Sequence, residues 1–393
     1  MSSVENSIKL PEDFCLSIAS HRQILNSIRI HKEISGAKLA RLNNFQPSTL
    51  VYILRALKDR GLIEVSRVAA LHKTAGKPPT LWRLAPDKGY IIGIEAIPGE
   101  LRAVVVNFQG KVIHCEHLVG VSNIGSQNII ESVAEFVEML RTKLDISHEK
   151  TIGVGMALTG WVDRAAGIVR YSRRLELKDF PIQEKLSHRL GLFVEAVNDA
   201  NAGALGIKWH EEDEVGHAPH VVFLTLNERT AYFGAGLILN HSLYEGADGG
   251  AGEICDALPS LKEFIDNAVA RVGSDHPLMA LAATQQIDIE DVIRCAQENC
   301  RLSKEILSQY SYFISEEIVR LVQMLAPNVI VLGGDLADAR ELIYSSIVNQ
   351  VESRLNELFP WGFTVPKIHF SSYGSYAVSV GAAALIMRRI FMP

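Results

Sequence analysis

The stretch GYIIGIEAIPGELRAVVVNFQGKVI, residues 89–113, decides the fold of this chain. It contains two apolar runs rich in β-branched residues, separated by a turn and ended by Gly110, a pattern that predicts a β-hairpin. Further strand-like runs alternate with helical stretches such as SQNIIESVAEFVEMLRTKL at 126–144. These runs are TIGVGMAL at 151–158, LFVEAVN at 192–198, HVVFLTL at 220–226 and NVIVLGG at 328–334. The alternation predicts an α/β fold for the chain after residue 86.

Length and composition limit the class of protein. A chain of 393 residues is long enough for two or three domains. Its five cysteines form no CxxC pair and resemble no disulfide framework, and the first ten residues lack the apolar core of a signal peptide. The longest apolar run near the C-terminus, at 377–387, is shorter than the roughly 18 residues that a membrane-spanning helix needs. These features predict a cytoplasmic protein with no membrane partner.

Charge is distributed unevenly along the chain. Residues 1–90 carry 14 Lys and Arg against 7 Asp and Glu, whereas the remaining residues carry 25 against 38, out of totals of 39 and 45. This asymmetry favours an N-terminal segment that binds a polyanion, joined to an acidic body. The alternative is an uneven distribution of charge that reflects no partner.

Residues 18–86 carry the pattern of a winged helix-turn-helix domain. Three segments each place apolar residues on one helical face; they are ASHRQILNSIRIH at 19–31, SGAKLARLNN at 35–44 and FQPSTLVYILRALKDRG at 45–61. We expect Ser35 to cap the second helix, and Pro47 and Gly61 to mark the start and end of the third. Two strand-like runs, 62–68 and 80–84, then flank a loop that forms the wing.

Candidate DNA contacts lie on the third helix and in the wing. On the helix they are Gln46, Ser48, Thr49, Tyr52 and Arg55, and in the wing they are Lys73 and Lys77. Each residue taken alone can equally belong to a solvated helix face or an ordinary hairpin loop. Three helices, a wing and a positive charge together predict binding to double-stranded DNA.

The order of motifs along the chain resembles that of the ROK family, which comprises sugar-responsive repressors, uncharacterised reading frames and sugar kinases. The resemblance rests on the N-terminal segment followed by GYIIGIE, and on GVGMALTGWVD at 153–163, NDANAGALG at 198–206, LYEGADGGAGEI at 243–254, NVIVLGGDL at 328–336 and SVGAAAL at 379–385. It implies a two-lobed actin-like (ribonuclease H-like) ATPase fold, with a cleft between the lobes and a C-terminal helix that returns to the first lobe. It also implies a homodimer or homotetramer.

The phosphate-binding motifs of the family's kinases are degenerate in this chain. Those kinases carry an Asp followed by Gly-Gly-Thr at the first hairpin turn, where this chain has Glu95 and then Ile97, Pro98 and Gly99. Proline has no N–H to offer a phosphate and the threonine hydroxyl is missing. The second, glycine-rich loop reads NERTAYFGAG at 227–236, with bulky Tyr232 and Phe233. We therefore expect no kinase activity and no cofactor.

The sugar-binding motifs are better preserved. The resemblance implies that Asn198, Asp199 and Glu253 hold sugar hydroxyls, with Asp199 as a vestigial catalytic base. The alternatives are a helix cap at 198–199 and a surface glutamate at 253. Family members continue that glutamate into a Gly-His pair and a cysteine-rich zinc loop, whereas this chain has Cys255 and Asp256, so we expect no metal. Asp256 either replaces the lost sugar contact or is a solvated loop residue.

The sequence therefore predicts a transcriptional regulator of the ROK type, a repressor, that binds operator DNA and a sugar or sugar derivative. The predicted domains are a winged helix-turn-helix at 1–86, a first actin-like lobe at 87–200 with the C-terminal helix at 376–393, and a second lobe at 201–375. The alternative is an ATP-dependent sugar kinase with an added N-terminal domain. The sequence leaves open the identity of the effector, its role as inducer or corepressor, the operator sequence, activation as against repression, and dimer as against tetramer.

Overall fold

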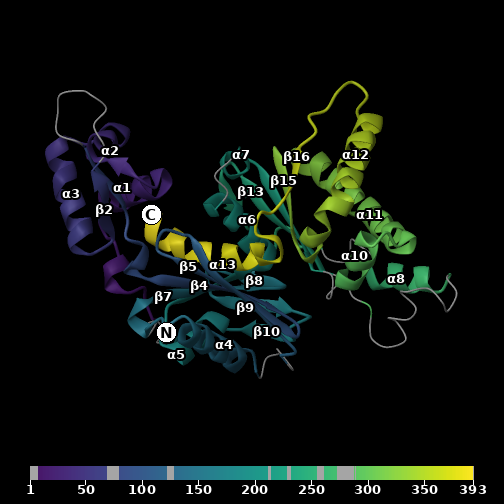
Figure 1. Ribbon diagram of the computed structural model, residues 1–393, viewed down its shortest axis with the longest axis horizontal. Coiled ribbons are helices and arrows are strands. Elements are labelled where there is room, and N and C mark those ends of the chain that lie inside the picture. The colour runs from purple at the N-terminus through teal and green to yellow at the C-terminus, as the bar shows by residue number, and fades with distance from the viewer. Residues whose placement is uncertain are drawn as a thin grey trace. The chain divides into compact units, whose positions relative to one another are not determined.

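The computed structural model of the chain describes residues 8–68, 79–121, 128–210, 214–227, 232–254, 261–271, 287 and 289–392. The chain folds into two compact units, each built from discontinuous segments (Figure 1). Unit 1 comprises residues 1–156, 181–196 and 382–393, and unit 2 comprises residues 157–180 and 197–381.

Unit 1 begins with a winged helix, which we call the head and define as residues 18–84. Its elements are α1 (Ala19–His31), β1 (Ile34–Ser35), α2 (Gly36–Leu42), α3 (Pro47–Asp59), β2 (Ile63–Val68) and β3 (Thr80–Leu84). The strands form a sheet in the order β1-β3-β2. Ser35 accepts a hydrogen bond from the Lys38 backbone N–H at 3.3 Å, and Pro47 opens α3, as the sequence predicts.

The head has an apolar centre of its own. Each helix turns one stripe of aliphatic side chains inward; the buried residues include Ile24, Leu25, Ile28, Leu39, Leu50, Ile53, Leu54 and Leu57. The hydrophobic spacing in the sequence therefore identified most of the inner faces, but Ile30 and Leu42, apolar residues of the same segments, are exposed.

The main sheet of unit 1 has five strands in the order β11-β7-β4-β5-β6. The strands are β4 (Tyr90–Ile97), β5 (Glu100–Asn107), β6 (Val112–Val119), β7 (Thr151–Leu158) and β11 (Val194–Asn198), the last two of which continue into unit 2. The predicted hairpin is confirmed, since β4 and β5 pair antiparallel from Tyr90↔Asn107 to Ile97↔Glu100. Helices α4 (Ile129–Lys143) and α5 (Ile182–Leu190) lie on one face, and α13 (Ala377–Phe391) lies on the other (Figure 1).

The head contacts the segment after β5 and the end of α13 beside three aromatic rings that lie outside the head. Phe108, fully buried after β5, has its ring centroid 5.3 Å from Phe14 and 5.5 Å from Phe391 at the end of α13. The Gln109 side chain donates a hydrogen bond to the Leu84 carbonyl at 2.7 Å, and Arg22 of α1 donates to the Met392 carbonyl at 3.3 Å. The Arg29 guanidinium of α1 also lies over the Phe391 ring, 5.8 Å from its centroid, so the head is attached to both the end of β5 and the end of α13.

Unit 2 contains a second five-stranded sheet in the order β14-β13-β12-β15-β16. Its strands are β12 (Val221–Asn227), β13 (Tyr232–Leu239), β14 (Ser242–Tyr244), β15 (Val329–Gly334) and β16 (Lys367–Phe370). Along β12 the side chains alternate between the two faces. Val222 and Leu224 enter the helical core, whereas Phe223 lies against Gly203.

Helices cover both faces of this sheet, and a small sheet precedes it in the sequence. The helices are α6 (Asp199–His210), α7 (Glu214–His217), α8 (Leu261–Val269), α10 (Ile289–Gln297), α11 (Arg301–Leu325) and α12 (Arg340–Leu358). The small sheet, in the order β10-β9-β8, consists of β8 (Trp161–Asp163), β9 (Ile168–Ser172) and β10 (Leu177–Phe180). Short 3-10 helices lie at Glu12–Phe14, Pro86–Lys88, His148–Lys150, Asp335–Ala339 and Gly374–Tyr376.

Among the described helices, none has both the length and the apolar character needed to cross a bilayer.

Candidate functional sites

Asn198 is the centre of the predicted ligand site. It is the last residue of β11, 3% exposed, and is followed directly by α6. Its Nδ2 donates hydrogen bonds to the Gly160 carbonyl at 2.9 Å and to Glu253 Oε1 at 3.1 Å, while its Oδ1 accepts from the Asn201 backbone N–H at 3.1 Å. The two interpretations from the sequence are thus compatible, since one amide caps α6 and also orients the Glu253 carboxylate.

Asp199 occupies the first position of α6 and is 5% exposed. Its Oδ1 accepts a hydrogen bond from the Ala200 backbone N–H at 2.7 Å. A carboxylate in the first turn of a helix interacts favourably with the helix dipole. Asn198, Asp199 and Glu253 all belong to unit 2, and Asn198 and Glu253 are in direct contact.

The backbone before Glu253 is fixed by a close approach to β13. Gly252 has φ of +86°, and a Cβ at this position would lie 1.8 Å from the Ala235 carbonyl oxygen. The Ala235 N–H also donates to the Gly252 carbonyl at 3.0 Å. Glycine is therefore required at 252, which explains one glycine of the GAGEI motif. Asp256 and Cys255 lie outside the described residues.

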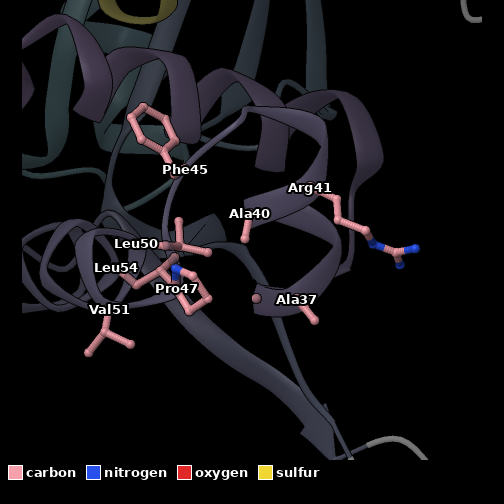
Figure 2. A pocket seen from close by; sticks show the side chains of 9 residues that line it. Ala37, Ala40, Arg41, Phe45, Pro47, Leu50, Val51 and Leu54 are labelled. Atoms are coloured by element: carbon pink, nitrogen blue, oxygen red, sulfur yellow. The ribbon is translucent and has the colours of Figure 1, made fainter.

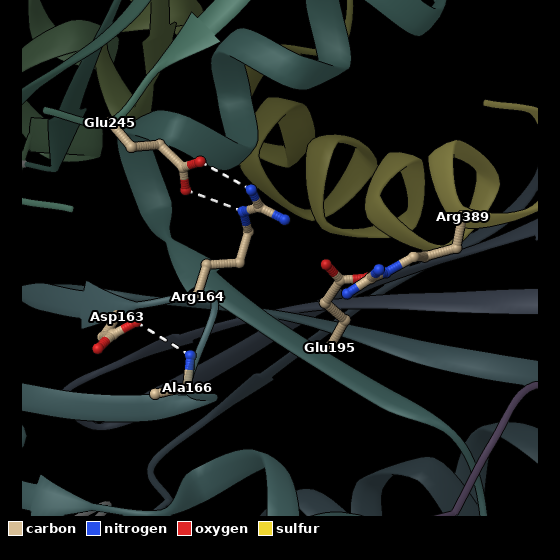
Figure 3. Close-up of polar contacts among 6 residues, drawn as sticks. All are labelled: Asp163, Arg164, Ala166, Glu195, Glu245 and Arg389. Atoms are coloured by element: carbon tan, nitrogen blue, oxygen red, sulfur yellow. Dashed lines mark hydrogen bonds and ion pairs between the residues drawn. The ribbon is translucent and has the colours of Figure 1, made fainter. Parts of the chain in front are cut away.

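Two ion pairs, one in each unit, join residues far apart in the sequence (Figure 3). Arg164 follows β8 and binds Glu245 with both arms, Nε to Oε1 and Nη2 to Oε2, each at 2.8 Å. In unit 1, Arg389 of α13 binds the buried Glu195 at 3.0 Å. Neither pair was predicted from the sequence, because separations of 81 and 194 residues leave no local signal.

Asp163, the last residue of the GWVD motif, is held as an anion (Figure 3). The Ala166 backbone N–H, which donates to Oδ1 at 3.0 Å, and then the Arg170 guanidinium at 2.8 Å lower the pKa of the Asp163 carboxyl below its ordinary value. These contacts close the β8–β9 turn, so Asp163 has a structural task in this sheet.

The turn between β4 and β5 carries a buried charge cluster. The Glu100 carboxylate follows Pro98-Gly99 directly and is 2% exposed. Its Oε2 lies 3.3 Å from Arg102 Nη2 and 2.8 Å from His117 Nε2.

The segment that corresponds to the kinases' second phosphate loop, residues 227–236, falls partly outside the described residues. Within the described part, Phe233 is buried in the core, and Gly234 and Gly236 pair with β12.

The predicted DNA contacts on α3 share one exposed face. Gln46, Ser48, Thr49, Tyr52 and Arg55 are all exposed, and Tyr52 is 72% exposed. The nearest charged partner of Arg55 is Asp59 at 4.0 Å, also exposed, so this pair holds the arginine only weakly. Lys73 and Lys77 lie outside the described residues.

An apolar pocket of about 590 Å³ lies between α2 and α3 (Figure 2). Its lining residues are Gly36, Ala37, Ala40, Arg41, Phe45, Pro47, Leu50, Val51 and Leu54. The Arg41 side chain extends away from the apolar lining (Figure 2). The pocket was not predicted from the sequence, since it depends on how two helices meet.

Within the described parts of the chain, no group of three or more His, Cys, Asp or Glu side chains is placed to hold a metal ion. The Asn198 site offers hydrogen bonding. Two carboxylates accept hydrogen bonds there, and hydroxyl groups of a neutral ligand are suitable donors.

Comparison with known proteins places the chain in a family. The model of the ROK family matches residues 91–389. A xylose repressor of Caldicellulosiruptor bescii is 23% identical, over 93% of this chain and 94% of its own length. A glucokinase of Thermotoga maritima is 24% identical, over 76% of this chain and 98% of its own length.

A solved structure shares the fold of nearly the whole chain. It is a ROK family transcriptional regulator, described as a homolog of the E. coli MLC protein, with 19% identity, a TM-score of 0.72, and coverage of 94% of this chain and 97% of that one. Because the family model also spans well over half of the sequence, the chain belongs to the ROK family.

Proposed function

We propose that this chain is a ROK-type transcriptional repressor that binds operator DNA through its head and a sugar through Asn198, Asp199 and Glu253. Asp256, outside the described residues, is a fourth candidate contact. The observation that carries the proposal is that one chain has both an exposed polar face on α3 and a buried Asn198 that contacts Glu253. The alignment with the xylose repressor covers 93% of this chain and so extends over the head. The alignment with the glucokinase covers 98% of that protein but only 76% of this chain.

The electrostatics of the β4–β5 turn support a regulator over a kinase. If this turn corresponds to the kinases' first phosphate loop, it offers Pro98, which lacks an N–H, and the buried Glu100 carboxylate. The Glu100 carboxylate is paired with Arg102 and His117 and accepts hydrogen bonds, so it offers a phosphate no donor. We therefore infer that this position no longer holds ATP.

The sugar then acts by binding one conformation of the protein more tightly than another. A ligand shifts a conformational equilibrium only by its difference in affinity for the two states. A coupling of about 1–3 kcal/mol changes operator affinity by roughly 5- to 150-fold. In a symmetric homodimer or homotetramer, two heads would read a palindromic operator.

The DNA half of the proposal is tested by recovering the genomic fragments that the purified protein retains at about 0.15 M salt, where phosphate contacts are screened as in the cell. We expect a small number of discrete palindromic sites. Salt-sensitive retention of all fragments alike would contradict the proposal.

A sugar kinase is the second candidate, supported by the buried Asp199 at the start of α6. ATP consumption is measured with D-xylose, D-glucose and N-acetyl-D-glucosamine for the wild type and Asp199→Asn. We expect no turnover above that of the variant. Turnover that requires both a sugar and Asp199 would establish the kinase instead.

A further inference from the structure

The loop that leads to Glu253 is attached to β8 by a two-armed ion pair. Arg164 grips both carboxylate oxygens of Glu245, the first residue after β14, at 2.8 Å each. The two side chains are 21% and 23% exposed, so solvent screens the pair only partly. A bidentate arginine–carboxylate contact fixes orientation as well as distance.

The middle of the same loop is attached to β8 at two further points. The Trp161 indole N–H donates a hydrogen bond to the Asp248 carbonyl. At Gly249, with φ of +82°, a Cβ would lie 2.7 Å from the Val162 carbonyl oxygen, so the two backbones are in close contact. Three neighbouring residues, Trp161, Val162 and Arg164, therefore contact three positions of the loop, which are 248, 249 and 245.

The end of the loop is held separately, because Gly252 is in close contact with Ala235 of β13. Glycine occupies positions 246, 249, 250 and 252, and glycine gives a backbone more conformational freedom than any other residue. Within the loop, the Ala251 N–H donates to the Glu245 carbonyl at 3.2 Å, which brings the two ends of the loop together. Holding Glu245 therefore also limits where Ala251, and two residues later Glu253, can lie.

We propose that Arg164 is a positioning residue. Its two hydrogen bonds to Glu245 fix the conformation of the 245–253 loop. In that conformation Glu253 accepts a hydrogen bond from Asn198 and is placed to bind the sugar. The proposal rests on the proposed function, because Glu253 is there a sugar contact. In this role Arg164 acts through Glu245 and the loop, so its removal leaves Asn198, Asp199 and Glu253 in place in the sequence but misplaces Glu253.

The first test is hydrogen exchange of the full-length, sugar-free protein, followed by mass spectrometry on peptides that cover residues 243–254. Arg164→Gln and Glu245→Gln are each expected to speed exchange in this loop several-fold. Arg170→Gln is the matched control, since it removes a comparable ion pair, with Asp163 at 2.8 Å, in the same small sheet. The control is expected to leave exchange in the loop unchanged.

The second test is calorimetric titration with D-xylose, D-glucose and N-acetyl-D-glucosamine. For whichever sugar binds the wild type, Arg164→Gln and Glu245→Gln are expected to raise the dissociation constant by about tenfold or more, the cost of losing a well-placed hydrogen bond to a charged group. The exchanged pair Arg164→Glu with Glu245→Arg is expected to recover most of this loss. A merely structural role would lower the melting temperature of the sugar-free protein without this selective effect.

The two tests separate this proposal from the proposed function. If loop exchange is unchanged in both single variants, or if Arg170→Gln has the same effect, the positioning role is wrong whether or not a sugar binds. If no sugar of the panel binds the wild type, the sugar-binding half of the proposed function loses its support, while the exchange result still decides whether Arg164 fixes the loop.

Discussion

At the scale of single residues, Asn198 links helix capping to ligand recognition. Its Oδ1 satisfies an N–H of α6, and its Nδ2 orients Glu253. The position can be changed so as to separate these two tasks, because serine also accepts a hydrogen bond as a helix cap but does not provide the amide donor.

We predict that Asn198→Ala and Asn198→Ser both abolish the rise in melting temperature that a bound sugar produces. Only Asn198→Ala is expected to lose about 1 kcal/mol of stability without sugar, the usual effect of removing a cap. Differential scanning calorimetry with and without sugar measures both effects. Sugar-induced stabilisation that survives in Asn198→Ser would show that the contact with Glu253 is dispensable.

Asp163 gives a prediction about pH. Its folded-state pKa is lowered by the Ala166 N–H and by Arg170, so its ionised form favours the folded state. This stabilisation is fully present above the ordinary aspartate pKa of 3.8 and is lost as pH falls through the lowered folded-state value. The melting temperature of Asp163→Asn is therefore expected to lie below that of the wild type at pH 6 and to approach it as pH falls below about 4.

The control for this pH dependence is Asp59→Asn, which changes a carboxylate that is 70% exposed. We expect no comparable difference from the wild type at either pH. If the advantage of the wild type over Asp163→Asn grew on acidification, the ionised Asp163 carboxylate would not be the form that stabilises the fold.

At the scale of elements, the sequence was sufficient to predict the helices and strands whose hydrophobic pattern is strong. The helices of the head and the β4–β5 hairpin were predicted to within a few residues, because buried aliphatic side chains recur with the helical or strand period. The small sheet β8-β9-β10 was not predicted, since its sequence is short, charged and held together by pairs such as Asp163–Arg170. The residues that orient Glu253 likewise come from β8 and β11, and no local pattern brings them together.

We predict that α3 binds DNA through its exposed face. Tyr52→Ala and Arg55→Ala are each expected to weaken binding to the operator by about tenfold or more without changing the melting temperature, as expected for loss of one base or phosphate contact. Fluorescence anisotropy at a fixed salt concentration measures the affinity. Arg173→Ala, which removes an exposed arginine of unit 2, is the control and is expected to bind operator as the wild type does. Unchanged affinity in both α3 variants would exclude this face.

At the scale of the whole molecule, the head is in contact with the end of α13 within unit 1, because Arg29 lies over the Phe391 ring and Arg22 donates a hydrogen bond to the Met392 carbonyl. The ring of Phe391 stacks on Phe108, which in turn contacts Phe14. The sequence alone did not reveal this connection, because Phe14 and Phe391 lie 377 positions apart. It makes the orientation of the head dependent on α13.

We predict that Phe391→Ala loosens the head. Truncating a buried phenylalanine costs about 3–5 kcal/mol, and hydrogen exchange in α1 and α3 is expected to accelerate. Binding to operator is expected to weaken, while sugar binding in unit 2 is expected to stay at the wild-type level. Equal loss of sugar binding would mean that the variant is unfolded beyond unit 1.

The most direct test of a sugar-responsive repressor is to measure operator affinity by anisotropy with and without each sugar, for the wild type and for Asp199→Asn. We predict that at least one sugar changes the operator affinity of the wild type by roughly 5- to 150-fold, as expected for a typical coupling between two sites, and that Asp199→Asn binds operator equally well but does not respond. An operator affinity that no sugar changes, together with sugar-dependent ATP turnover, would contradict it.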